Sequence, residues 1–249
     1  MKAILAAGLI ALSAACGIAR AAEFTPQQKD EIGAIVRDYL IKNPEVLLDV
    51  SKELEKRQQA ADVKARNTAV SENAAAIFRN QVDLVAGNPN GDVTMVEFFD
   101  YNCAWCKKGL PEVLSLLKQD PKLRLVMKEF PIFGEDSEYA ARAALASQAQ
   151  GKYWAFHLAL LGHQGKVNKD VVDKTAKEQG LDLARLKKDM EQPAIAEAIV
   201  RNQKLAQTLN ITGTPGFVID RTVVAGYLPA AGLEEKIKAV RDAGGCVSC

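Results

Sequence analysis

Residues 93–106 read Val-Thr-Met-Val-Glu-Phe-Phe-Asp-Tyr-Asn-Cys-Ala-Trp-Cys, and this stretch decides the fold. Its first part, residues 93–101, is rich in β-branched and aromatic side chains and predicts a strand. Residues 103–119 predict a helix that begins at Cys103. The chain is therefore expected to pass from a strand directly into a helix that carries two cysteines on its first turn.

The two cysteines of this junction, Cys103 and Cys106, lie one helical turn apart. Unpaired N–H groups and the macrodipole at a helix N-terminus favour an anion. This lowers the pKa of the Cys103 thiol and makes its thiolate available, while Cys106 can form or receive the disulfide. A structural disulfide and half of a zinc site are the alternatives, and the strand-to-helix context favours a redox pair.

Two further features accompany the cysteines. Residues 213–216, Gly-Thr-Pro-Gly, lead into a later strand and suit a cis-proline turn that offers the backbone at Thr214 and Pro215 to an extended substrate. Glu97 is a carboxylate in an apolar strand, and a buried acid costs free energy unless it is paired. Lys128, on the adjacent predicted strand, is its candidate partner. The alternative for Glu97 is that it lies on an exposed face, and the alternative for Pro215 is that it is an ordinary loop proline.

The remaining pattern predicts an α/β chain without internal repeats, in the order β-α-β, a block of helices, then β-β-α. The expected elements are strands at residues 123–130, 217–220 and 222–225, a mostly helical block at 137–209 and a closing helix at 230–241.

The N-terminal part of the mature chain, residues 24–81, predicts helix. It begins with Thr25 as N-cap and Pro26 at the first helical position, and Asn43-Pro44 interrupts it. Residues 87–91 predict a loop and a domain boundary, so we expect a helical extension at 22–87 and a second domain at 88–249. The extension's apolar stripe needs a covering surface. A second copy of the chain is the simplest one, and folding back on the second domain is the alternative.

Residues 1–21 predict a cleavable signal peptide, because Lys2 precedes an uncharged apolar run that ends before the small residues Ala19 and Ala21. A membrane anchor and lipidation at Cys16 are the alternatives. We therefore expect a periplasmic protein.

Composition excludes other classes. The formal net charge is +1, and 30 basic face 31 acidic residues once Lys2 and Arg20 are removed, which argues against nucleic acid as a partner. Cys246 and Cys249 form a second pair, for which we expect a local disulfide in an oxidising compartment; a metal site and a second redox pair are the alternatives. Cysteines in separate elements argue against a joint tetrathiolate site, and we expect no metal or cofactor.

Residues 96–106 together with 213–217 resemble the DsbA-like thiol–disulfide oxidoreductases, over about residues 93–242. The resemblance implies a thioredoxin-like fold with a helical insertion at about residues 135–209. It implies that Cys103 attacks and Cys106 resolves, that Thr214-Pro215 is the cis-proline loop, and that Glu97 assists proton transfer. Residues 24–81 resemble the N-terminal extension of the ScsC-like exported branch, which can mediate oligomerisation.

The dipeptide between the cysteines, Ala104-Trp105, lacks the His found in the strongest oxidants of that family. A less stabilised thiolate makes the potential less oxidising, which favours isomerase or reductase activity. We expect Trp105 to contact substrate, exported proteins with thiols or disulfides to be the substrates, and a membrane protein to be the redox partner. A thiol-based copper-handling or chaperone protein is the alternative function.

Overall fold

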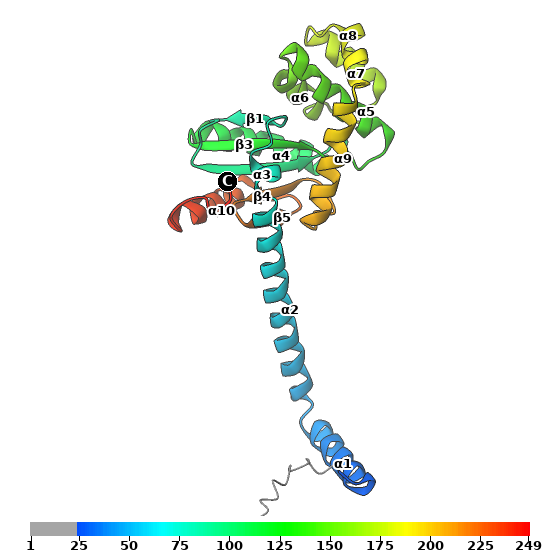
Figure 1. Ribbon diagram of the computed structural model, residues 1–249, viewed down its shortest axis with the longest axis vertical. Coiled ribbons are helices and arrows are strands. Elements are labelled where there is room, and N and C mark those ends of the chain that lie inside the picture. Colours follow the sequence, from blue (N-terminus) through cyan, green and yellow to red (C-terminus); the bar gives the residue numbers. More distant parts are fainter. Residues whose placement is uncertain (1–23) are drawn as a thin grey trace, which may run out of the picture. The chain divides into compact units, whose positions relative to one another are not determined.

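The computed structural model describes residues 24–249 (Figure 1). The predicted signal peptide at residues 1–21, with Cys16, lies outside the described residues. The chain divides into two compact units, one up to residue 58 and the other at residues 59–249, and the division falls within helix α2.

The first unit consists of helix α1 (Pro26–Lys42) and the beginning of α2 (Glu45–Glu72). Thr25 and Gln28 form a capping box: the Thr25 hydroxyl accepts the Gln28 N–H at 3.2 Å, and the Gln28 side chain accepts the Thr25 N–H at 2.9 Å. The predicted start of the helix and its interruption at Asn43-Pro44 are confirmed.

No residue of α1 is buried, and the apolar stripe of this unit lies exposed. Its large members are Ile32, Ile35, Val36, Tyr39, Leu47, Leu48, Val50 and Leu54. Exposed apolar side chains gathered on one segment are typical of an interaction surface.

The second unit is built on a sheet in the order β1-β3-β2-β4-β5. Strands β2 and β3 are parallel, and the other neighbours pair antiparallel. The strand bounds are β1 Leu84–Gly87, β2 Val93–Phe99, β3 Leu123–Glu129, β4 Gly216–Ile219 and β5 Thr222–Ala225. Every residue of β2 is buried, which makes it the central strand that its sequence indicates.

The alternation of β2 divides the core into two layers. Met95 and Phe99 pack with helices α4 (Ala104–Gln119) and α10 (Ala230–Asp242), whereas Val96 and Phe98 pack with α3 (Ala74–Phe78), the end of α2 and α9 (Pro193–Thr208). A side chain of β2 or β3 therefore faces one set of helices or the other according to its position along the strand.

A block of helices is inserted between β3 and β4, as predicted. It comprises α5 (Glu135–Ser147), the short 3₁₀ turn η1 (Gln148–Gln150), α6 (Tyr153–Leu161), α7 (Lys169–Glu178) and α8 (Leu183–Met190). Figure 1 shows α5 to α8 gathered beside the sheet, with α9 leading back to it. The predicted thioredoxin-like fold with a helical insertion is confirmed.

The predicted domain boundary at residue 88 is wrong. Strand β1 pairs with β3, and Ile77 and Phe78 of α3 are fully buried, so residues 59–87 belong to the second unit. The four-residue strand is too short to recognise by its pattern. The loop after it packs closely rather than linking domains, since a Cβ on Gly91 would lie 2.4 Å from the Lys122 carbonyl oxygen.

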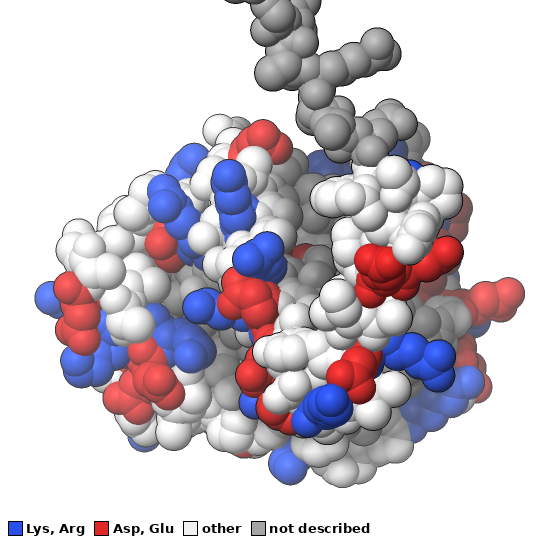
Figure 2. Space-filling model, turned by 90° about the horizontal axis from the view of Figure 1, so that it is seen from below, with Lys and Arg blue, Asp and Glu red and all other residues white. Residues whose placement is uncertain are grey.

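Charged side chains of both signs mix on the face drawn in Figure 2, where neither Lys and Arg nor Asp and Glu dominate. This distribution agrees with the near-neutral composition of the chain.

Candidate functional site

Cys103 lies where β2 passes into α4 and is the N-cap residue of that helix. Its Sγ accepts a hydrogen bond from the backbone N–H of Cys106 at 3.1 Å. Both thiols are free and buried, with Cys103 2% and Cys106 0% exposed. The predicted geometry of a cysteine that opens the helix is confirmed.

The turn at residues 213–216 contains a cis bond between Thr214 and Pro215, as predicted. It reaches the cysteines because β4 follows it directly and pairs with β2, which places Gly216 opposite Phe98. The Cys103 thiol donates a hydrogen bond to the Thr214 carbonyl oxygen at 3.1 Å. The Thr214 hydroxyl is buried and has no hydrogen-bond partner among the described residues.

The two thiols have opposite acidities. Hydrogen bonding with the Cys106 side chain lowers the pKa of Cys103 to about 6, burial opposes this shift, and the backbone of Cys106 and Trp105 lowers the pKa further. Burial raises the pKa of Cys106, and the Cys103 sulfur and the Glu97 charge raise it further. The site therefore holds one thiolate and one protonated thiol near neutral pH.

Glu97 is 4% exposed and lies on the face of β2 that packs against α4. Burial, and then the charge of Cys103, raise the pKa of its carboxyl to about 8. It makes no hydrogen bond or ion pair with another residue of the described chain. Glu97 is therefore a buried acid beside the cysteines, as expected, and it stays protonated near neutral pH.

Lys128 is not the partner of Glu97, and that prediction is wrong. In the register of β2 with β3, Lys128 lies opposite Phe98, so its side chain faces α3 rather than α4. There it forms a buried ion pair with Asp83 and donates to the Ala76 carbonyl oxygen at 2.7 Å. A shift of one residue along a strand reverses the face, and sequence alone did not give the register.

Asp100 is a further positioning residue, which the sequence analysis did not single out. Its Oδ1 accepts from the Asn102 N–H and the Ser137 hydroxyl, both at 2.7 Å. Its Oδ2 accepts from the N–H groups of Ile132 at 2.7 Å and Phe133 at 3.2 Å. These bonds hold the segment that leads into Cys103, and the local signal was an Asp two residues before the Asn.

A buried polar cluster joins this segment to the insertion. Glu129 Oε1 accepts from the hydroxyls of Tyr101 at 2.8 Å and Tyr153 at 2.6 Å, and the Tyr101 hydroxyl lies 3.1 Å from His157 Nδ1. Burial raises the pKa of Glu129 to about 8 and lowers that of His157 to about 3. The members come from three separate parts of the chain, so no sequence motif marks the cluster.

An exposed aromatic surface lies beside the cysteines. Trp105 is 52% exposed, its ring centroid lies 5.1 Å from that of Tyr227, and Lys108 Nζ lies 4.7 Å above the Trp105 ring. A hollow of about 680 Å³ adjoins this surface, lined by residues that include Asn102, Lys107 and Phe133. This exposed surface can contact a polypeptide.

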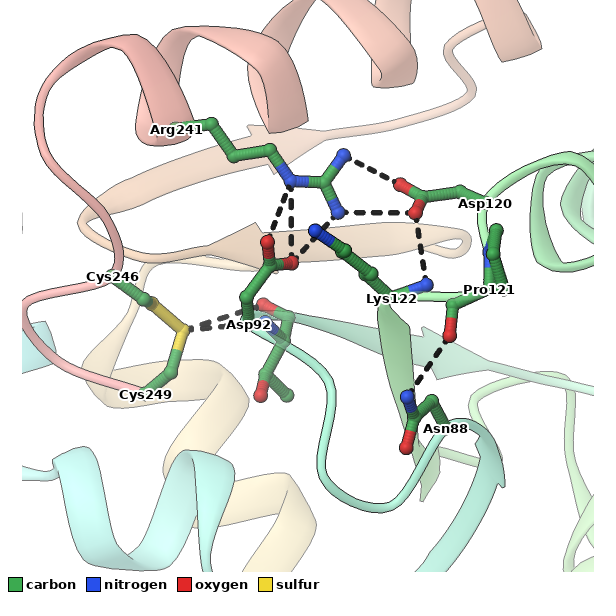
Figure 3. Close-up of polar contacts among 9 residues, drawn as sticks. Asn88, Asp92, Asp120, Pro121, Lys122, Arg241, Cys246 and Cys249 are labelled. Atoms are coloured by element: carbon green, nitrogen blue, oxygen red, sulfur yellow. Dashed lines mark hydrogen bonds and ion pairs between the residues drawn. A yellow bond between two sulfur atoms is a disulfide. The ribbon is translucent and has the colours of Figure 1, made fainter.

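Cys246 and Cys249 are joined in a disulfide, as predicted. Figure 3 shows this disulfide between the labelled residues Cys246 and Cys249. The Cys249 Sγ accepts the N–H of Thr94, the second residue of β2, at 3.4 Å. Since Cys103 follows the other end of β2, the two cysteine pairs lie at opposite ends of the central strand.

Residues 94–238 match the family model of the DSBA-like thioredoxin domain. The chain belongs to that family. Residues 28–61 also match the model of the copper resistance protein ScsC N-terminal domain, so the predicted ScsC-like extension is confirmed as a likeness of this segment.

Solved structures extend the family likeness over most of the chain. A thioredoxin-like oxidoreductase from Silicibacter pomeroyi DSS-3 is 46% identical, with 68% of this chain and 97% of that chain covered and a TM-score of 0.67. BcfH from Salmonella enterica Typhimurium is 31% identical, with 85% of this chain and 95% of BcfH covered and a TM-score of 0.71. A periplasmic thioredoxin-like protein from the same Salmonella serovar is 26% identical, with 66% of this chain and 93% of that protein covered and a TM-score of 0.59.

The chain also matches part of some much longer proteins. It is 30% identical over 140 residues to Na(+)/H(+) antiporter NhaA 3 of Salinispora tropica, which covers 55% of this chain and 22% of the antiporter. The chain thus spans about a fifth of that relative. Between residues 24 and 249, none of the helices has the length and apolar character needed to cross a membrane.

We expect iodoacetamide to modify Cys103 with a half-maximal rate near pH 6, because its thiol pKa is lowered to about 6. Cys106 stays unmodified, because its pKa is raised and it is buried. Rates measured against pH, with the modified peptide identified by mass spectrometry, check this. In Cys106→Ala the midpoint moves up, since the side-chain hydrogen bond from residue 106 is lost. Equal alkylation rates for the two cysteines, rising only at about pH 8.5, contradict this prediction.

We expect Glu97→Gln to stabilise the reduced protein at high pH. The carboxyl pKa rises from 4.5 to about 8 on folding, so the wild type loses stability as pH rises through this range. The variant gains on the order of 5 kcal/mol at about pH 9 and nothing below about pH 4. Urea unfolding across pH measures this, with the exposed Glu235→Gln as control. A gain that does not depend on pH contradicts the burial of a protonated acid.

Proposed function

We propose that this protein is an exported thiol–disulfide oxidoreductase that forms, reduces or isomerises disulfides in other exported proteins through Cys103 and Cys106. One observation carries the proposal: the Cys103 sulfur lies between the N–H of Cys106 and the carbonyl of Thr214, each at 3.1 Å. The first contact favours its thiolate, and the second places a backbone acceptor where a substrate strand can bind. Family membership supports the same reaction class.

In the oxidising direction, a substrate thiolate attacks Cys103 Sγ in the Cys103–Cys106 disulfide. The bond between the two cysteines breaks, and the Cys106 sulfur leaves with the electron pair. Glu97, whose raised pKa of about 8 keeps it protonated, is the proton donor that we assign to this sulfur. A second substrate thiol then attacks the mixed disulfide, the substrate is oxidised by two electrons, and both cysteines are left reduced.

In the isomerising direction the reaction begins from the reduced pair. The Cys103 thiolate attacks an incorrect substrate disulfide, and a substrate thiolate leaves. That thiolate, or another in the same substrate, later attacks the mixed disulfide and releases Cys103, so no net electrons are transferred. The pKa of about 6 supports this route, since the thiolate is present near neutral pH.

Substrate binding is assigned to two surfaces that flank the sulfur. The backbone at Thr214-Pro215 pairs with an extended substrate segment, and the exposed ring of Trp105 packs against its side chains. Trp105 and Tyr227 supply apolar area with little loss of side-chain freedom, which suits varied unfolded substrates.

Export to the periplasm follows from the predicted signal peptide at residues 1–21, and a periplasmic structural relative supports it. A membrane redox protein then resets the cysteine pair after each oxidising or reducing turnover, whereas an isomerising turnover returns the pair to its starting state. The uncharged Ala104-Trp105 dipeptide favours isomerisation or reduction. A reduction potential of the Cys103–Cys106 pair of about −200 mV agrees with this preference, whereas a potential of about −120 mV indicates an oxidase.

We expect Cys103→Ser to abolish oxidation of a reduced substrate and repair of a scrambled one, because the attacking sulfur is lost. Cys106→Ser accumulates mixed disulfides, because the resolving thiol is missing. Turnover assays and non-reducing gels measure both effects. Cys246→Ser/Cys249→Ser is the matched control and keeps turnover, since that pair lies at the other end of β2. Full turnover by Cys103→Ser overturns the assignment.

We also propose that residues 24–58 join copies of this chain. Their apolar side chains lie exposed; Ile35 is 68% and Leu54 66% exposed. Several active sites in one assembly can act repeatedly on one misfolded substrate, which suits isomerisation. The segment proposed ends at 58, because residues 59–87 complete the second unit.

Light scattering at tens of micromolar tests this. We expect the mature chain to be an oligomer, deletion of residues 24–58 to give monomers, and Ile35→Lys to weaken the assembly without changing the second unit. If the chain that includes residues 24–58 is a monomer, the proposal is overturned. If the oligomer persists after the deletion, the interface lies outside residues 24–58 and the proposal is also overturned.

A further inference from the structure

The last four residues, Cys246 to Cys249, form a loop that docks on the end of the sheet. The N–H groups of Val247 and Ser248 donate to Asp220 Oδ1 at 2.9 and 2.8 Å. Arg79 donates to the Ser248 carbonyl oxygen at 3.0 Å. Three bonds to two other parts of the chain hold this loop in one position.

The segment that leads into the loop is also anchored. Arg241, near the end of α10, bonds to Asp92 at 2.7 Å and to Asp120 at 2.8 Å, and Figure 3 shows this network beside the disulfide. Gly244 and Gly245 follow with φ of +97° and +107°, a region open to glycine, and turn the chain back toward the sheet. The anchors persist when the disulfide is broken, because none of them involves a sulfur.

Three potential metal ligands meet where this loop contacts Asp220, the residue that follows β4. Asp220, Cys246 and Cys249 each offer one ligand atom, and these atoms lie within 4.8 Å of one another. The Cys246 sulfur lies 3.5 Å from Asp220 Oδ1, and Asp220 Oδ2 accepts no hydrogen bond from residues 24–249. All three residues are partly buried, so an ion can reach them from solvent.

We propose that this cluster is a redox-gated metal site. In the disulfide state the sulfurs are bonded to each other and no site exists. When Cys246 and Cys249 are reduced, their two sulfurs and one Asp220 oxygen bind a borderline-soft divalent cation of the zinc class. Two cysteines separated by two intervening residues are a common spacing of zinc ligands. A carboxylate beside two thiolates suits zinc better than it suits a softer monovalent ion.

The Thr94 backbone supplies outer support. Its N–H contacts the Cys249 sulfur at 3.4 Å, and such a donor steadies a thiolate ligand. A tetrahedral zinc ion needs the two sulfurs about 3.7 Å apart, and the 5.6 Å between the Cα atoms of Cys246 and Cys249 permits this by side-chain rotation.

The chemistry balances with a thiol reductant. A dithiol of another protein attacks one sulfur of the disulfide, and its second thiol closes a new disulfide on the donor. Cys246 and Cys249 thereby gain two electrons and two protons. The divalent cation then displaces both S–H protons as it forms two metal–thiolate bonds, and one oxygen of the Asp220 carboxylate completes the three protein ligands.

The decisive variant is Asp220→Asn. Asp220 has a φ of +47°, which Asn also tolerates. The amide oxygen of Asn can still accept both loop N–H bonds, so the substitution removes the ligand charge and keeps the anchor. Asp242→Asn makes the same charge change on α10, outside the cluster, and is the matched control.

The experiment uses the tag-free mature chain, residues 22–249, in a Cys103→Ser/Cys106→Ser background, so that neither Cys16 nor the active-site thiols add zinc binding. After phosphine reduction, zinc is titrated in competition with a chromophoric chelator, and cobalt spectra report thiolate ligation. We expect one zinc per reduced chain and none in the oxidised chain. Cys246→Ser/Cys249→Ser loses the ion, Asp220→Asn binds at least about tenfold more weakly, and Asp242→Asn is unchanged.

Three results overturn the proposal: no stoichiometric zinc binding after reduction, equal binding by the oxidised chain, or unchanged affinity in Asp220→Asn. Circular dichroism of each variant shows that a loss of binding is not a loss of fold. Binding of monovalent copper with no zinc binding also overturns it, since that ion does not require the carboxylate.

Discussion

The hydrogen bond from the Cys106 N–H to the Cys103 sulfur is the interaction on which the chemistry depends. It forms because Cys103 is the N-cap residue of α4, the helix that follows the buried strand β2. A helix N-terminus is a fixed source of unpaired N–H groups. The Cys106 side chain contributes most to the lowered pKa of Cys103, and the backbone of Cys106 and Trp105 lowers it further, so the thiol is acidic although the Ala104-Trp105 dipeptide carries no charge.

The features that sequence predicted well are local or marked by unusual residues. The strand at 93–99, the capped helix after Cys103 and the cis-proline turn each have a direct signal in composition or spacing. The paired cysteines at residues 246 and 249 are also close enough in sequence for their disulfide to be expected. Glu97 was identified because a carboxylate in an apolar strand is conspicuous, and its burial bears this out.

The features that sequence did not predict depend on long-range register. Lys128 and Glu97 lie on adjacent strands, yet an offset of one residue places them on opposite faces, and Asp83 neutralises the lysine instead. Strand β1 becomes a strand through pairing with β3 rather than through its own pattern. The cluster around Glu129 is assembled by the insertion, so its members have no common signal in the chain.

The insertion between β3 and β4 also determines when the site can form during folding. The Cys103 sulfur and its acceptor at Thr214 are separated by 111 residues. Closing a longer loop adds little entropy cost, about 0.6 kcal/mol for each doubling of length, so the insertion can be large without preventing assembly. A chain that emerges from its N-terminus nevertheless presents Cys103 and Cys106 long before β4 arrives. Until then the thiols lack the proline turn, and the incomplete polypeptide can undergo disulfide exchange before it can catalyse it.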